Sequence, residues 1–82
     1  MPERGFFAKA EWDGEAGVWY VAESDLPGLV AEAETPTALM AKLRVLVPEL
    51  VELNRHLLDW QPGDEVPIHF IADQTERIRL TG

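Results

Sequence analysis

A repeating leucine pattern between residues 36 and 58 predicts one long amphipathic helix. Leucines recur there at spacings of three and four residues, which places on one helical face Leu39, Leu43, Leu46, Leu50, Leu53 and Leu57. Thr35 suits the N-cap, and Pro36 suits the first helical position, where a missing N–H costs nothing. Pro48 removes a hydrogen bond inside the helix, so we expect either a kink or a break there.

A second apolar row runs beside the leucines and consists of Met40, Val47, Val51 and Leu58. A helix that lies on a sheet commonly needs this extra width. We therefore favour a place in the core for the second row, and a contact with another helix is the alternative.

Alternation of apolar and polar residues predicts three short strands before the helix, at residues 5–12, 18–24 and 29–34. The core-facing residues of the first strand are the even-numbered ones, Phe6, Ala8, Ala10 and Trp12. If residues 13–17 form the turn, Ala10 faces Tyr20, and Trp19 points away from the core. A slip of one residue would reverse the two faces of the second strand.

A fourth strand is predicted at residues 66–72. A strand that follows a helix tends to re-enter the same sheet by a right-handed crossover, parallel to its neighbour. The sequence therefore predicts a single α+β domain over residues 1–82. Its sheet is an antiparallel three-strand meander plus a parallel edge strand, in the order 3-2-1-4, with one long helix on one face. Residues 76–80 also alternate, and we expect them to lengthen that edge or to pair with another chain.

Composition narrows the possible functions. The chain has 82 residues, no cysteine and a formal net charge of −8. Without cysteine there is no disulfide, zinc–thiolate site or thiol nucleophile. The negative charge disfavours direct nucleic-acid binding, because such binding needs Lys and Arg against the phosphates. An acidic surface favours a basic partner, although solubility alone is a sufficient reason for it.

Targeting signals are not expected in this sequence. No apolar run approaches the roughly 20 residues that span a bilayer, and the first residues lack the pattern of a secretory signal. We therefore expect a cytoplasmic protein that does not bind membranes.

No group of residues indicates catalysis, a cofactor or a metal. Asp13 and Glu15 fall in a predicted turn, where Asp serves the turn geometry. The two histidines, His56 and His69, fall on separate elements without a carboxylate at ligand spacing. Ser24 lacks the G-x-S-x-G setting of a hydrolase nucleophile. The expectation is a protein without enzyme activity.

The sheet face away from the helix is the predicted interface for a protein partner or for a second copy of the chain, a dimer first. One helix covers one face, so large apolar residues on the other face form an exposed patch unless something docks there. The predicted interface residues are Phe7, Trp19, Val21, Glu23, Asp25, Val30, Glu32, Glu34 and Ile71. Trp19 is its expected anchor; in the alternative register Trp19 lies in the core.

Two runs between Ala10 and Asn54 carry a family pattern: AEWDGEAGVWYVAESDLPGLVAEAETPTALMAKL and, shortly after it, VPELVELN. The chain resembles the HicB-like antitoxin family here, in particular its small stand-alone members. The most specific part of the pattern is Asp25-Leu26-Pro27-Gly28-Leu29. This resemblance implies a degenerate ribonuclease-H-like fold without nuclease activity.

The resemblance also implies a partner. In HicB-type systems this domain binds and masks a small basic toxin, HicA, which cleaves messenger RNA. Four acidic residues are candidates to meet such a basic surface because of their position and charge, rather than through a family motif: Glu23, Asp25, Glu32 and Glu34.

One departure from the family limits what carries over. Typical HicB antitoxins add a helix-turn-helix or ribbon-helix-helix segment that binds their operator. About ten residues follow the fourth predicted strand, too few for such a module, so we do not expect operator binding. The alternative function is a stand-alone homo-oligomeric scaffold or regulatory domain without a cognate toxin.

Overall fold

Four strands and one helix make up the fold. The structure, a computed structural model, describes residues 5–56, 63–75 and 77–81. Its elements are β1 (Phe6–Asp13), β2 (Val18–Ser24), β3 (Glu32–Ala33), α1 (Pro36–Leu53) and β4 (Ile68–Asp73). The strands form one sheet in the order β3-β2-β1-β4, in which β1 and β4 are parallel and the other neighbours are antiparallel. The predicted α+β class and strand order are confirmed.

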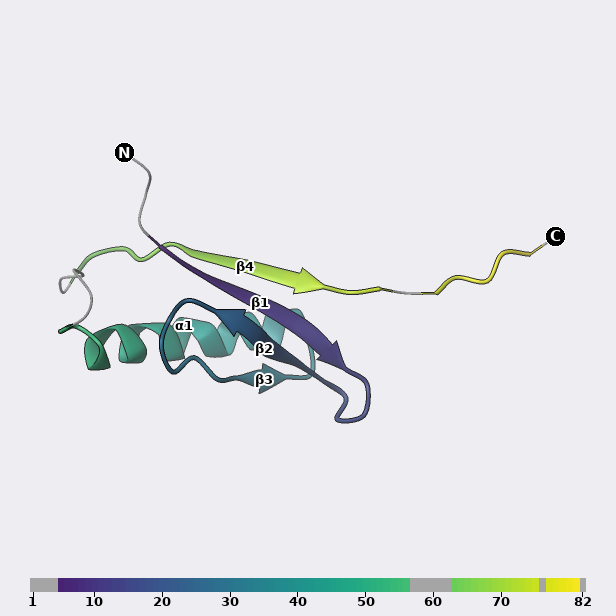
Figure 1. The fold of residues 1–82 in the computed structure, drawn as a ribbon, viewed down its shortest axis with the longest axis horizontal. Coiled ribbons are helices and arrows are strands. Elements are labelled where there is room, and N and C mark those ends of the chain that lie inside the picture. Colours follow the sequence, from purple (N-terminus) through teal and green to yellow (C-terminus); the bar gives the residue numbers. More distant parts are fainter. Residues whose placement is uncertain (1–4, 57–62, 76, 82) are drawn as a thin grey trace.

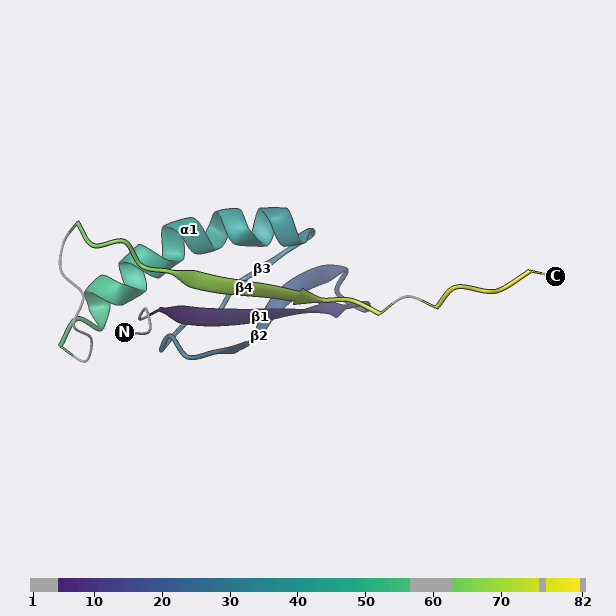
Figure 2. The same ribbon diagram turned by 90° about the horizontal axis from the view of Figure 1, so that it is seen from above.

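Helix α1 lies on one side of the sheet (Figure 1, Figure 2). We call the side of the sheet toward α1 the inner face and the opposite side the outer face. Burial follows this division along β1, where Phe6, Ala8 and Ala10 are buried and the residues between them are less so. The predicted facing of β1 is therefore confirmed for these three residues, whereas Trp12, also predicted to face the core, is 48% exposed.

The turn between β1 and β2 is shorter than predicted. β1 extends to Asp13, which pairs with Val18, so the loop consists of residues 14–17. Oδ1 of Asp13 accepts two backbone N–H groups from within the turn, at 3.0 and 3.2 Å. Gly17 takes a φ of 71°, a conformation that favours glycine. Asp13 is therefore the last residue of β1 and not the first residue of the turn, and its side chain stabilises the turn that follows.

The register of β2 differs from the prediction as a result. Trp19 pairs with Trp12 and is only 5% exposed, so the prediction that Trp19 points outward is wrong. Val21 pairs with Ala10 and packs against the core, so its outward assignment is wrong as well. Tyr20, predicted to face inward, is 38% exposed. Side chains alternate along a strand, so one residue fewer in the loop moves each following side chain to the other face.

A bulge restores the predicted facing at the end of β2. Val21 pairs with Ala10 whereas Glu23 pairs with Lys9, which leaves Ala22 as an extra residue in β2. An extra residue changes the alternation by one step. Glu23 therefore lies on the outer face with Lys9, where the prediction had placed it.

β3 is much shorter than the predicted strand at residues 29–34. A corner replaces its first half, in which Leu26 and Leu29 are buried in the core and Gly28 has a φ of 84°. The carbonyl of Ala31 still accepts the N–H of Val21 at 3.1 Å, outside the regular ladder. The two inward-turned leucines bend the chain away from β2, which limits regular pairing to Glu32–Ala33.

α1 begins at the predicted residue and ends before the predicted one. Oγ1 of Thr35 accepts the N–H of Ala38 at 3.0 Å, as expected of an N-cap. The helix ends at Leu53, where Asn54 leaves helical geometry with φ −105° and ψ 15°. Nδ2 of Asn54 donates to the carbonyl of Leu50 at 2.8 Å, which satisfies one carbonyl of the last turn.

The helix runs through Pro48 without a break, and its axis bends toward the C-terminal end (Figure 2). Of the two predicted outcomes for Pro48, a kink and a break, the structure has the bend. Residues 54–56 form a turn, and the predicted helical residues 57 and 58 lie outside the described residues. Leu53 is exposed, so the predicted leucine face does not stay covered up to the end of the helix.

The core lies between α1 and the inner face. One cluster of buried residues comprises Phe6, Ala8, Leu26, Leu29, Leu43 and Val47; a second comprises Ala10, Trp19, Ala33 and Leu39. Met40 and Val51 from the second apolar row of the helix pack against the first cluster, so that row serves the core as predicted. No polar or charged residue is buried in the described part of the chain.

β4 occupies the edge of the sheet beside β1. Its parallel pairing with β1 begins at Phe6 and Ile68. Just before this pair, the N–H of Phe6 donates to the carbonyl of Pro67 at 2.9 Å. Beyond β4, residues 77–81 are extended and lie away from the other elements (Figure 1). Residues 77–81 are exposed throughout and form no regular element.

Candidate protein-binding surface

The outer face of the sheet carries aromatic, apolar and acidic side chains, and no described helix lies over it (Figure 2). The strand register brings its members together from four strands that are separate in the sequence. They are Phe7, Lys9 and Glu11 of β1, Tyr20 and Glu23 of β2, Glu32 of β3, and His69, Ile71 and Asp73 of β4. The sheet itself, rather than any loop, therefore builds this surface.

Exposed apolar groups lie in the middle of the outer face and at its β4 edge. Tyr20 is 38% exposed and Ile71 is 52% exposed, while Phe7 between their strands is half-buried. Large side chains that are neither covered nor charged are the groups that anchor protein interfaces. Tyr20 was missed by sequence reasoning, because its facing depends on the length of the turn before β2.

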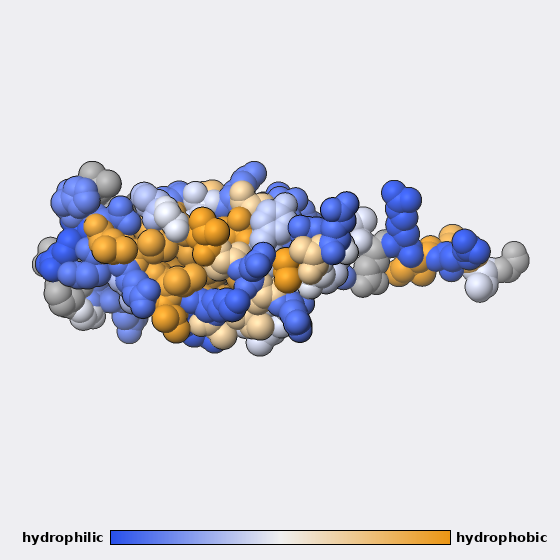
Figure 3. Space-filling model, turned by 90° about the horizontal axis from the view of Figure 1, so that it is seen from below, coloured by the Kyte–Doolittle hydropathy of each residue, from blue (hydrophilic) through white to orange (hydrophobic). Residues whose placement is uncertain are grey.

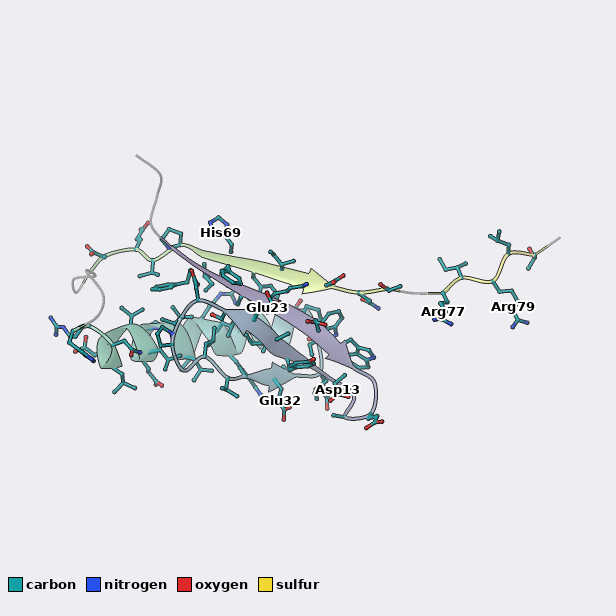
Figure 4. All side chains as sticks on the ribbon, in the orientation of Figure 1. Asp13, Glu23, Glu32, His69, Arg77 and Arg79 are labelled. Atoms are coloured by element: carbon teal, nitrogen blue, oxygen red, sulfur yellow. The ribbon has the colours of Figure 1, made fainter. Side chains whose placement is uncertain are left out.

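Acidic groups dominate the charge of the outer face. Glu11, Glu23, Glu32 and Asp73 are carboxylates, and Nζ of Lys9 lies 3.9 Å from Oδ2 of Asp73. An ion pair at such an exposed position contributes little to stability, and it offsets one negative charge among four. Figure 4 shows Glu23 over the middle of the sheet, Glu32 at the β3 edge and His69 at the β4 edge. The face thus presents negative charge to an approaching partner from several strands.

The structure separates the predicted interface residues into three groups. Phe7, Glu23, Glu32 and Ile71 lie together on the outer face. Val30 and Glu34 are exposed at the β3 edge, before and after β3. The remaining group is formed by residues with structural contacts: Trp19 and Val21 in the core, and Asp25 at the corner after β2.

The corner that contains Asp25 holds two parts of the fold together. Oδ1 of Asp25 accepts the backbone N–H of Phe7 at 2.8 Å, which ties the end of β2 to the start of β1. The carbonyl of Pro27 accepts Nδ2 of Asn54 at 3.5 Å, so the corner also meets the end of α1. The stretch Asp25-Leu26-Pro27-Gly28-Leu29 therefore has a structural use in this chain.

The side of the molecule where α1 and β3 lie has exposed apolar groups of its own. Val30, Val45 and Leu53 are largely exposed, and Figure 3 shows apolar side chains gathered over this part of the domain. Sequence reasoning anticipated Val30 as exposed but not Val45 and Leu53. Val45 and Leu53 belong to α1 and therefore lie on the opposite side of the sheet from the outer face.

An apolar groove of about 360 Å³ lies between α1 and residues 63–68, which lead into β4. Its apolar lining comprises Met40, Leu43, Val47, Pro48, Val51, Val66 and Ile68, and charged residues at its rim are Arg44, Glu52, Arg55 and Asp64. The groove exists because α1 lies over β2 and β3, so the inner side of β4 is only partly covered.

Within residues 5–56, 63–75 and 77–81, no three side chains of His, Cys, Asp or Glu come together to hold a metal ion. Among these same residues, no helix is long and apolar enough to cross a membrane.

Comparisons with known proteins identify relatives without assigning them an activity. The profile of a family described as a domain of unknown function, DUF1902, matches residues 6–82. The crystal structure of the hypothetical protein TTHA1013 from Thermus thermophilus, an extremely thermophilic bacterium, is similar, with 40% sequence identity and a TM-score of 0.53. The similarity covers 90% of this chain and 99% of that one. A comparison with curated proteins found no match. Neither relative is described as a HicB-like antitoxin.

Proposed function

Because the chain belongs to the family of the domain of unknown function DUF1902, whose description names no activity, we propose a function from its surface: a non-catalytic domain that binds a basic protein on its outer face. The observation that carries this proposal is the composition of that face. The face carries the exposed Tyr20 on β2 and Ile71 on β4, the half-buried Phe7 on the intervening strand β1, and one carboxylate from each of the four strands.

A basic protein fits this surface for two reasons. The apolar groups supply area that is removed from water on docking, and the carboxylates steer and orient a partner of opposite charge. A neutral partner would leave Glu23 and Glu32 without complementary charge at the interface, which costs desolvation energy. The partner should therefore bring Lys or Arg together with an apolar contact of its own.

The resemblance to HicB-like antitoxins suggests which basic protein this is. In that reading the partner is a small HicA-type toxin that cleaves messenger RNA, and binding masks it. The net charge of −8 and the acidic outer face support a partner of this kind.

The test is a binding titration with a purified HicA-type toxin that carries an inactivating substitution. We expect binding that weakens as salt is added, because exposed charges are screened. The double variant Glu23→Lys and Glu32→Lys should weaken binding at least tenfold at low salt. The control Glu49→Lys and Glu65→Lys makes the same change in net charge at exposed positions of α1 and of the segment before β4, and should weaken it far less.

Two further arms separate specific docking from charge alone. Tyr20→Ala should lower the affinity for the toxin without changing its salt dependence. Cytochrome c, a basic protein of unrelated shape, should bind weakly to the wild-type chain. Equal losses in both charge-reversal variants, or no binding of the toxin at all, would contradict the proposal.

The second candidate is a stand-alone homo-oligomeric scaffold or regulatory domain. The specific observation in its favour is the exposed C-terminal segment that follows an edge strand. A protein that self-associates and does not bind the toxin would support this candidate over the first.

A further inference from the structure

We propose that the C-terminal arm, residues 77–81, pairs as a β-strand with β4 of a second copy of this chain, and that the two copies exchange their arms. This proposal is independent of the binding of a basic protein on the outer face. It assigns a use to a segment that the structure extends into solvent.

β4 is the edge of the sheet that has room for another strand. The sheet ends at β3 on one side and at β4 on the other. β3 has two residues, whereas β4 has six. No described strand pairs with the free side of β4 (Figure 1). An edge strand of this length presents a row of N–H and C=O groups that can accept a further strand.

The arm has the pattern of a strand without having a partner in its own domain. Ile78 and Leu80 are 79% and 91% exposed, and they alternate with Arg77 and Arg79. Figure 4 shows both arginines on the same side of the extended segment, far from the four strands. Two large apolar side chains held in water at the end of a chain favour burial against another surface.

The inner side of β4 has a surface that fits these two side chains. Ile68 and Phe70 point toward the inner face but remain half-buried, because α1 lies over β2 and β3. The apolar groove between α1 and residues 63–68 continues from Ile68. Apolar groups that enter from the free edge of β4 would cover both Ile68 and Phe70.

Alternation places the arm correctly for this contact. Ile78 and Leu80 are even-numbered, like Ile68 and Phe70, so an arm that continues β4 directs them to the inner face. In an antiparallel pair, directly opposite residues share a face. A two-fold axis near residue 74 sets Leu80 opposite Ile68 and Ile78 opposite Phe70 of the second copy. Each copy then gives an arm and receives one, as a closed dimer requires.

The arm is also long enough. At about 3.3 Å per residue, the seven residues from Gln74 to Leu80 span about 23 Å, and the six residues of β4 span about 20 Å. Leu80 can therefore reach the first residue of β4 in the second copy, which is where the apolar groove begins.

Charge favours a second copy of this chain as the occupant. Residues 74–82 contain two arginines and one glutamate, whereas residues 1–73 contain five basic and fourteen acidic residues. A basic arm is thus attracted to the acidic body of another copy. On the outer face, Arg77 would lie opposite Ile71 and diagonal to Asp73, which already pairs with Lys9, and Arg79 would lie opposite His69.

The first test is the mass of the full chain in solution by light scattering over a hundredfold dilution range. We expect a dimer of twice 9.2 kDa that dissociates on dilution. The double variant Ile78→Ser and Leu80→Ser should raise the dissociation constant at least tenfold. The control Val30→Ser and Val45→Ser removes two exposed apolar residues elsewhere and should leave the mass unchanged.

The second test uses the absence of cysteine in the chain. The double variant Leu80→Cys and Ile68→Cys should form an interchain disulfide on oxidation and run at twice the mass on a denaturing gel. Leu80→Cys alone should not crosslink, because the two arm tips lie at opposite ends of the paired strands. The pair Leu80→Cys and Val45→Cys should not crosslink efficiently either.

Three results would overturn the proposal: a wild-type monomer over the whole dilution range, a dimer that the arm variant leaves intact, or an intrachain disulfide between positions 68 and 80. The arm variant should still bind the HicA-type toxin with unchanged affinity for each chain. A dimer that does not bind the toxin would contradict only the proposed function. A monomer that binds the toxin would contradict only the arm exchange.

Discussion

The rings of Trp12 and Trp19 face each other across the β1–β2 hairpin, with their centroids 5.8 Å apart and their planes inclined by 54°. They are direct cross-strand partners at a separation where aromatic rings attract. Trp19 is 5% exposed and Trp12 is 48% exposed, so the pair reaches from the core to the solvent. Because both rings belong to the inner face, this pair marks the register of the hairpin.

Trp19→Ala should destabilise the fold by about 3–5 kcal/mol, because it empties a buried site next to Ala33 and Leu39. Tyr20→Ala, one residue further along on the outer face, should cost about 1 kcal/mol or less. Urea unfolding followed by circular dichroism measures both. Similar losses for the two variants would mean that the hairpin has the other register.

Asp25→Ala should destabilise the fold by about 1 kcal/mol, because it leaves the N–H of Phe7 without the acceptor that lies 2.8 Å away. The local signature is faster hydrogen exchange at the Phe7 amide. Glu34→Ala, at another exposed acidic position, is the control and should not change that exchange rate. Unchanged exchange in the Asp25 variant would contradict the structural assignment of this residue.

Gly5→Ala should weaken the pairing of β1 with β4. A Cβ at Gly5 would stand 2.7 Å from the carbonyl oxygen of Pro67, closer than such atoms pack, so the two strands must shift apart. We expect a loss of about 1–3 kcal/mol, the usual cost of overpacking. At Gly14 the nearest atom to a new Cβ is 3.6 Å away, so Gly14→Ala should be tolerated. Thermal unfolding of the two variants makes the comparison.

Thr35→Ala should destabilise α1 by about 1 kcal/mol, because the N–H of Ala38 loses the side-chain acceptor that caps the helix. Thr37→Ala lies in the first turn, exposed and outside the cap, and replaces a poorer helix former by a better one. It should be neutral or slightly stabilising in the same urea titration. Equal losses in both variants would show that Thr35 does not act as a cap.

Local sequence patterns predicted most of the elements and their order. Thr35 with the leucine spacing placed the start of α1, and the alternation from Phe6 to Ala10 identified the buried face of β1. The parallel edge position of β4 followed from the general handedness of strand–helix–strand connections. These features depend on residues close together in the sequence, which is why the sequence was sufficient for them.

The candidate surface depended on details that local patterns do not contain. Phe7, Glu23, Glu32 and Ile71 were correctly assigned to the outer face, whereas Trp19 and Tyr20 were exchanged. The pattern of β2 is compatible with either facing, since it has apolar residues at both odd and even positions. The stretch around Asp25 stood out in the sequence, but the hydrogen bond from Phe7 to the Asp25 side chain could be identified only from the fold.

By itself, the amino-acid sequence determined the strand order, the start of the helix and the acidic balance of the chain, because these follow from residue type and spacing. Only the tertiary structure decided which aromatic residue of β2 is buried, how far β3 extends and where the helix stops. The first depends on one residue fewer in the turn before β2, the second on the burial of Leu26 and Leu29, and the third on Asn54, which leaves helical geometry. Such a choice is made by packing against α1, where Trp19 fills the space beside Leu39 that Tyr20 would otherwise have to occupy.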